Sequence, residues 1–158
     1  MMKMNLKRLS LITFLMFACA GGGAESFAQR KAISGAEVTG TFRSYFGGKF
    51  KDSYNEILIQ ALGGNKLKIE ISLIYPYESS AGLTAHIGAA SGEARIEGDT
   101  AVFAPEDGES CKITLKFSRP GTLIVTTENN LECGFGHNVS ADGTYKKTSG
   151  ARPKFGAN

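Results

Sequence analysis

The chain has 158 residues, with 18 lysine and arginine residues against 15 aspartate and glutamate residues and a net charge of +3. Hydrophobic residues make up 42% of it and charged residues 21%, a balance typical of a globular protein and not of a disordered one. The excess of positive charge is small, and no basic stripe with interleaved aromatic residues is present. The composition therefore argues against a nucleic-acid partner.

Residues 1–28 have the pattern of a secretory signal peptide of bacterial type. Lys3, Lys7 and Arg8 form a basic head, and the apolar run LSLITFLMFACA follows it. That run is too short to cross a bilayer, which takes roughly 20 apolar residues, so we expect no transmembrane helix in the mature chain. Small residues before Gln29 predict cleavage after Ala28. Cleavage there removes three basic residues and one acidic residue, which leaves 15 against 14 and a net charge near +1.

A second interpretation of the same segment stays open. The residues Met16-Phe17-Ala18-Cys19 resemble a bacterial lipoprotein box, in which Cys19 would be lipidated. The expected location is therefore periplasmic or secreted, with a lipid anchor through Cys19 as the alternative.

In the first half of the mature chain, apolar and polar residues alternate with a period of two residues. We expect a first strand over residues 38–46 and a hairpin formed by residues 55–62 and 66–75, joined at Gly63-Gly64-Asn65. In the second arm of this hairpin one face is apolar, which predicts a strand with one buried side. That face carries Leu67, Ile69, Ile71, Leu73 and Tyr75.

The second half continues the pattern. Residues 93–97 and 100–104 flank Gly98-Asp99, and this spacing places Ile96 opposite Ala101. Residues 111–117 and 122–127 flank the turn Arg119-Pro120-Gly121. The last strand is expected over residues 138–147, and residues 148–158 read as a polar tail.

About eight short strands separated by turn signals predict a single all-β domain over residues 33–147. Gly40-Thr41-Phe42 near the start and Gly143-Thr144-Tyr145 near the end suggest that the first and last strands are neighbours. Such a contact would close the sheet, so the expected fold is an antiparallel sandwich or a closed barrel.

Two cysteines remain after removal of the signal. An even number in an oxidising compartment predicts a disulfide between Cys111 and Cys133. Both would lie at the open end of the hairpin that turns at residues 119–121, within the 4.4–6.8 Å between Cα atoms that a disulfide requires. A metal site is the weaker interpretation, because the chain has no CxxC pair and only His86 and His137.

Candidate functional residues are few. Tyr45, Phe46, Phe50 and Tyr54 surround a glycine pair between the first two strands, and they form either a binding surface or a plug for one end of the barrel. Phe135 and His137 extend that candidate surface. Gly134 and Gly136, which flank Phe135, belong either to a stapled crossover or to a backbone that approaches a ligand. We assign no catalytic residue, metal ligand or cofactor, because no nucleophile or phosphate-loop motif accompanies the two histidines.

The pattern of paired cysteines with Cys133-Gly134-Phe135-Gly136-His137-Asn138-Val139 and Gly143-Thr144-Tyr145 resembles an uncharacterised family of small exported bacterial β proteins. The resemblance covers residues 84–147 and implies export and a β fold. The chain is more loosely similar to periplasmic lysozyme inhibitors, through Ser149-Gly150-Ala151-Arg152 in the predicted tail. This similarity implies no inhibitory residue.

These observations predict a non-catalytic binding or inhibitor module of the bacterial envelope. Its partner would be an envelope or extracellular protein or a glycan. The alternative is a carrier that holds a small molecule inside an eight-stranded barrel, and a histidine-based hydrolase is the third hypothesis.

Overall fold

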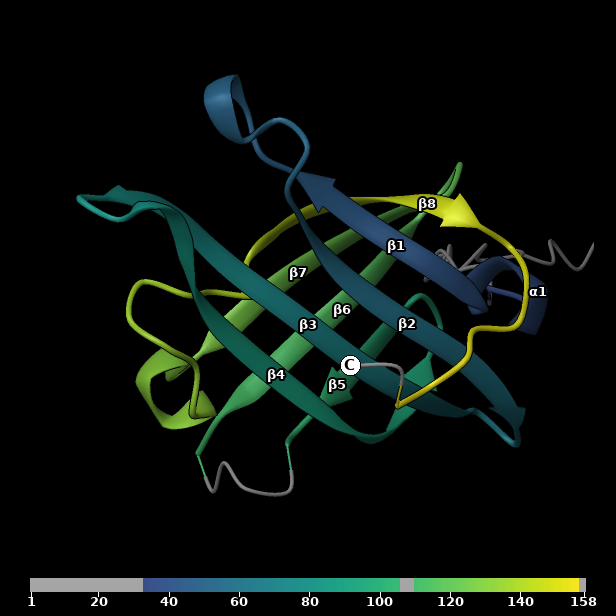
Figure 1. Cartoon of the computed structure of the whole chain (residues 1–158). Coiled ribbons are helices and arrows are strands. Elements are labelled where there is room, and N and C mark those ends of the chain that lie inside the picture. Colours follow the sequence, from purple (N-terminus) through teal and green to yellow (C-terminus); the bar gives the residue numbers. More distant parts are fainter. Residues whose placement is uncertain (1–32, 106–109, 157–158) are drawn as a thin grey trace, which may run out of the picture.

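The computed structural model describes residues 33–105 and 110–156, so the predicted signal peptide and Cys19 lie outside the described residues. Eight antiparallel strands form a closed barrel in chain order, in which each strand pairs with the next and β8 pairs back with β1 (Figure 1). Of the two predicted architectures, the barrel is therefore confirmed. The strands are β1 (Gly40–Tyr45), β2 (Tyr54–Gly63), β3 (Lys66–Ser79), β4 (Gly82–Glu97), β5 (Thr100–Phe103), β6 (Lys112–Ser118), β7 (Thr122–Glu128) and β8 (Gly143–Ser149).

The core is built by the alternation that the sequence predicts. Every second side chain of a strand points into the barrel, and these positions carry large apolar residues. Those exposed by less than 2% include Phe42, Ile57, Ile59, Leu67, Ile69, Ile71, Phe103, Ile113, Leu115, Leu123 and Tyr145. The predicted pair of Ile96 and Ala101 is confirmed in the register of β4 and β5.

A short helix, α1 (Gly35–Val38), lies at one end of the barrel, which we call the α1 end (Figure 1). Ser34 and Glu37 form a capping box, in which the side chain of each residue bonds to the backbone N–H of the other. The N–H of Ile33 donates to the carbonyl of Gly98 in the β4–β5 turn at 3.2 Å. Val38, which the sequence places in the first strand, ends this helix and is 2% exposed.

The predicted disulfide is confirmed. Cys111 precedes β6, and Cys133 ends the 3₁₀ helix η2 (Asn130–Cys133) that follows β7. Their Cα atoms lie 4.8 Å apart, and both residues are buried. The bond holds the chain that leaves β7 against the start of β6.

The end of the chain differs from the prediction. β8 begins at Gly143 instead of residue 138, because residues 138–142 bond locally: Val139 N–H donates to the carbonyl of Gly136, and Asp142 N–H donates to Ser140 Oγ. After Ser149 the chain returns along the outside of the barrel (Figure 1). There Lys68 Nζ lies 4.6 Å from the centre of the Phe155 ring, and Gly156 N–H donates to Glu70.

Candidate functional site

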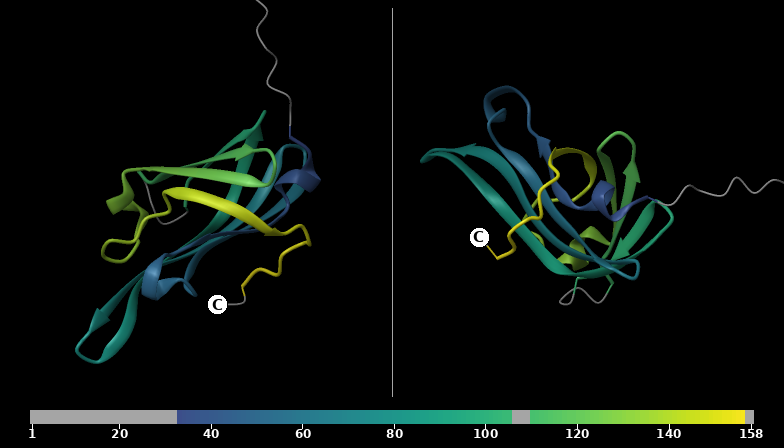
Figure 2. Two further views of the ribbon diagram at one scale, coloured as in Figure 1. Left: turned by 90° about the horizontal axis from the view of Figure 1, so that it is seen from above. Right: turned by 90° about the vertical axis from the view of Figure 1, so that its right-hand side faces the viewer.

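The β3–β4 hairpin projects beyond the rest of the barrel (Figure 2). β2 pairs with β3 no further than Ser72, and β5 pairs with β4 only from Arg95 to Glu97. The two long strands therefore pair only with each other from residue 73 to the hairpin turn and back to residue 94. We call residues 74–87 the arm, and the end of the barrel that carries it the arm end.

The inner face of the arm carries a ring cluster. Tyr75 and Tyr77 follow the buried Leu73 at a spacing of two, so they continue the core face of β3 past the barrel. The His86 ring stacks on that of Tyr77 at 4.7 Å between centroids and on that of Tyr75 at 6.5 Å. The His137 ring meets His86 edge to face at 5.6 Å. Such geometry is typical of stable aromatic contacts.

The outer face of the arm carries large aliphatic side chains that are open to solvent. Ile87 is 73% exposed and Leu83 is 66% exposed, and both alternate with the inward residues of β4. Tyr75 on the inner face is 40% exposed, although its predicted place was a buried face. The reason is that β3 runs beyond the strands that would cover it. Both faces of the arm thus expose large hydrophobic side chains.

The β3 edge of the arm contacts the start of β2 and the connection between β1 and β2. Ile74 N–H donates to Asn55 Oδ1 at 2.8 Å, and Pro76 has no N–H to offer. Lys49, in the 3₁₀ helix η1 (Gly48–Phe50), forms an ion pair with Glu78, which lowers the pKa of that carboxyl. These contacts connect the β3 edge of the arm to the neighbouring part of the barrel, and a proline at an edge position is unfavourable for the addition of another strand.

The other edge is held by the segment of residues 134–139. Gly136 N–H donates to the carbonyl of Ile87 at 3.0 Å. A Cβ on Gly136 would lie 2.6 Å from that oxygen, and a Cβ on Gly88 would lie 2.9 Å from both Phe135 and Val139. The two glycines therefore let this segment pack directly on β4. These contacts fit a stapled crossover, and the approach of a ligand to the Gly136 backbone stays a prediction.

The six residues of the predicted binding surface fall into two groups. Tyr45 and Tyr54 pair across β1 and β2 with ring centroids 5.4 Å apart, and the Arg43 guanidinium lies 4.1 Å from the centre of the Tyr54 ring. Phe46 and Phe50 are half-buried in the β1–β2 connection. Phe135 packs against the core, and His137 contacts the arm.

The sequence did not single out Tyr75, Tyr77 or the arm itself. One signal was available, since residues 79–92 contain no Asp, Glu, Lys or Arg in a chain that is 21% charged. An uncharged strand of that length is unusual at an exposed edge, where natural proteins place charges or proline. The alternation of Tyr75 and Tyr77 also continues past the length of an ordinary strand.

Chemistry-bearing side chains are sparse in the described ranges. These residues contain no group of three or more His, Cys, Asp and Glu side chains placed to hold a metal ion. No helix among them has the length and hydropathy to cross a membrane. The His86 ring contacts the rings of Tyr75, Tyr77 and His137.

No protein-family model, curated protein or solved structure matches this chain. The resemblance to exported β proteins and the looser similarity to lysozyme inhibitors therefore stay predictions.

Proposed function

We propose that the protein is a non-catalytic binding module of the bacterial envelope that holds a partner protein with its arm. The observation that supports this proposal is the exposure of large hydrophobic side chains on both faces of a projecting hairpin. Tyr75, Leu83 and Ile87 are between 40% and 73% exposed. Tyrosine and aliphatic residues at the centre of a patch are typical of protein interfaces, where they are buried on binding.

The arm is also prepared for binding before a partner arrives. The ion pair of Lys49 with Glu78 and the hydrogen bond of Ile74 to Asn55 fix one edge. Gly136 and His137 fix the other edge. A surface that is already ordered loses less conformational entropy on association, so more of its contact energy contributes to affinity.

A carrier with a ligand inside the barrel receives less support from the same structure. The inward positions are filled by large apolar side chains such as Ile59, Ile69 and Leu115, each without measurable exposure. A ligand in the interior would have to displace such core residues, which are packed as densely as an organic crystal.

The proposal is tested by changing one exposed aliphatic residue at a time. Ile87→Asp and Leu83→Asp place a charge on the arm, and Ile124→Asp is the matched control, because Ile124 is a 41% exposed aliphatic residue on β7. Affinity for partners is measured against periplasmic proteins and a lysozyme panel, with a photo-crosslinking residue at position 83. We expect micromolar binding or inhibition that is lost in the two arm variants and kept in the control. Crosslinks or inhibition that persist unchanged in Ile87→Asp would rule the arm out.

A further inference from the structure

A cavity of about 380 Å³ lies at the α1 end, opposite the arm. It opens to solvent between α1 and the β6–β7 turn, and its volume falls within the range of small-molecule sites. Phe42 and Phe117 line it with apolar surface, and their rings meet edge to face at 6.1 Å between centroids. Ile33, Ala36 and Pro120 add further apolar groups.

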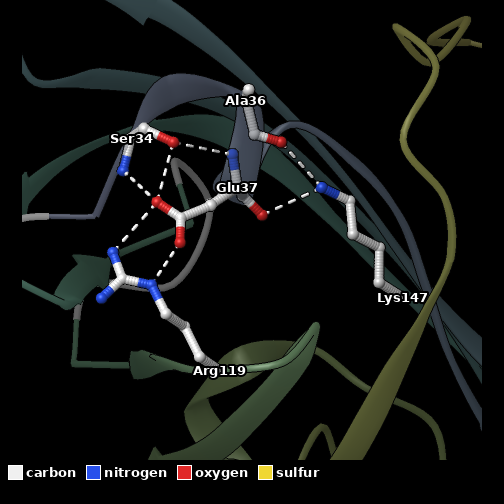
Figure 3. Close-up of polar contacts among 5 residues, drawn as sticks. All are labelled: Ser34, Ala36, Glu37, Arg119 and Lys147. Atoms are coloured by element: carbon white, nitrogen blue, oxygen red, sulfur yellow. Dashed lines mark hydrogen bonds and ion pairs between the residues drawn. The ribbon is translucent and has the colours of Figure 1, made fainter.

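Three ionisable side chains line the same cavity (Figure 3). Glu37 accepts hydrogen bonds from Arg119, with 3.0 Å between Oε2 and the guanidinium Nη2, and its carboxylate also accepts from Ser34. Lys147 reaches from β8 to α1, where Nζ donates to the carbonyls of Ala36 at 2.8 Å and Glu37 at 2.9 Å. The carboxylate of Glu37 is thus engaged by Arg119, whereas Lys147 binds neutral oxygens.

The charge of Lys147 is therefore only partly compensated. An ammonium has three N–H donors, and two of them are used by these carbonyls. Lys147 Nζ also lies 5.7 Å from the centre of the Phe42 ring. Desolvation lowers the pKa of Lys147, and the charge of Glu37 acts in the opposite direction. The described residues that line the cavity carry two positive charges and one negative charge. An anion would supply the missing compensation.

We propose that this cavity binds a small amphipathic monoanion, a carboxylate on a short apolar chain. The carboxylate meets the ammonium of Lys147, and the chain lies on Phe42 and Phe117. A cation would meet net positive charge, and a strongly hydrated anion without a chain would leave the apolar lining unused. The proposal uses none of the arm residues and stands independently of the function proposed above.

The test titrates the ¹⁵N-labelled protein, purified from the periplasm, with octanoate and separately with octanol. Octanol has the same chain length without the charge. We expect saturable NMR shifts at the α1 end with a Kd below about 1 mM for octanoate, and binding of octanol at least about tenfold weaker. Lys147→Gln should weaken the binding of octanoate about tenfold. Lys112→Gln, which changes an exposed lysine at the other end of β6, should leave the binding of octanoate unchanged.

Ala36→Leu provides a variant that fills the cavity without touching a charge, and it should reduce the binding of both probes. A spectrum with native dispersion shows that each variant is folded. The proposal is wrong if octanoate produces no saturable shifts, if the shifts lie at the arm end, or if octanol binds as well as octanoate.

Discussion

Glu37 in α1 and Arg119 in the β6–β7 turn are 82 residues apart in the sequence, yet their side chains meet in a two-point ion pair. This contact attaches the only described helix outside the 3₁₀ turns to the rim of the barrel. Hydrogen bonds from Arg119 and from Ser34 hold the pKa of Glu37 well below its usual range.

Arg119→Gln should release α1. Because the pKa of Glu37 is depressed in the folded state, its ionised form favours the attached helix above the ordinary glutamate pKa, and this contribution is lost as the pH falls towards the depressed value. In the variant the carboxyl should titrate nearer its ordinary range. The amides of Val38 and Thr39, which bond within this helix, should then exchange faster with solvent.

NMR titration of the carboxyl and hydrogen exchange measure both effects. Lys112→Gln, which removes a comparably exposed ion pair with Glu128, is the control and should leave α1 unchanged. Equal exchange rates in Arg119→Gln and the unmodified protein would contradict the role assigned to Arg119.

The disulfide should contribute a large share of the stability. Cys111→Ser opens a loop whose ends are 22 residues apart, and we expect the free energy of unfolding to fall by about 2–5 kcal/mol. Urea unfolding measures the loss. Thiol titration of the denatured, unreduced protein should find no free thiol at positions 111 and 133. Two reactive thiols in protein folded under oxidising conditions would show that the bond does not form.

Tyr145→Phe tests a polar group inside the barrel. The Tyr145 hydroxyl, which has no measurable exposure, donates to the carbonyl of Ala141 at 2.9 Å. Removal of the hydroxyl leaves the Ala141 carbonyl without this hydrogen bond. We therefore expect the free energy of unfolding to fall by about 1–3 kcal/mol. Burial also raises the pKa of the Tyr145 phenol. The protein should therefore lose stability as the pH rises above about 10, the ordinary tyrosine pKa, and the variant should lose less over that range.

Urea unfolding at neutral pH and near pH 11 separates the two effects of Tyr145→Phe. Tyr45→Phe is the control, since Tyr45 is 55% exposed. If Tyr145→Phe loses as much stability at alkaline pH as the unmodified protein, another group causes that loss.

Gly136→Ala should displace the segment of residues 134–139 from the arm. The new Cβ would lie 2.6 Å from the carbonyl oxygen of Ile87, so the backbone must move, at a cost of about 1–3 kcal/mol. Gly47→Ala is the matched control, because a Cβ there has no neighbour within 4 Å. Thermal unfolding should show the difference, and NMR should show that the His137 ring no longer contacts His86. A variant as stable as Gly47→Ala would argue against tight packing at this edge.

Most features of the fold could be predicted from patterns of residues that lie close together in the sequence. Alternation in β3, the turn residues between strands and the pair of cysteines predicted the barrel strands, the hairpin register at Ile96 and the disulfide. These features depend on residues near one another in the chain or on one pairing rule. The capping box of Ser34 and Glu37 was equally local, and its pattern was readable in the sequence although it was not singled out.

The candidate sites were harder to predict, because they depend on where strands stop being paired. The Tyr75 ring is exposed because β2 pairs with β3 no further than Ser72. No residue near Tyr75 in the sequence indicates where that pairing stops. The cavity at the α1 end depends on contacts of Glu37 and Lys147 with partners about a hundred residues away. The type of a side chain alone does not indicate which residue it contacts so far along the chain.

The pairing of β1 with β8 also has a consequence for the order of the chain. Ser149 lies opposite Thr41, so the two ends of the barrel sequence are neighbours in space. Joining the end of β8 to α1 through a short linker would preserve every strand pair. New termini could then be opened in the exposed turn at Gly63 and Gly64, where added Cβ atoms would meet nothing within 4 Å. Such a circular permutant should fold to the same barrel, with β3 as its first strand and β2 as its last.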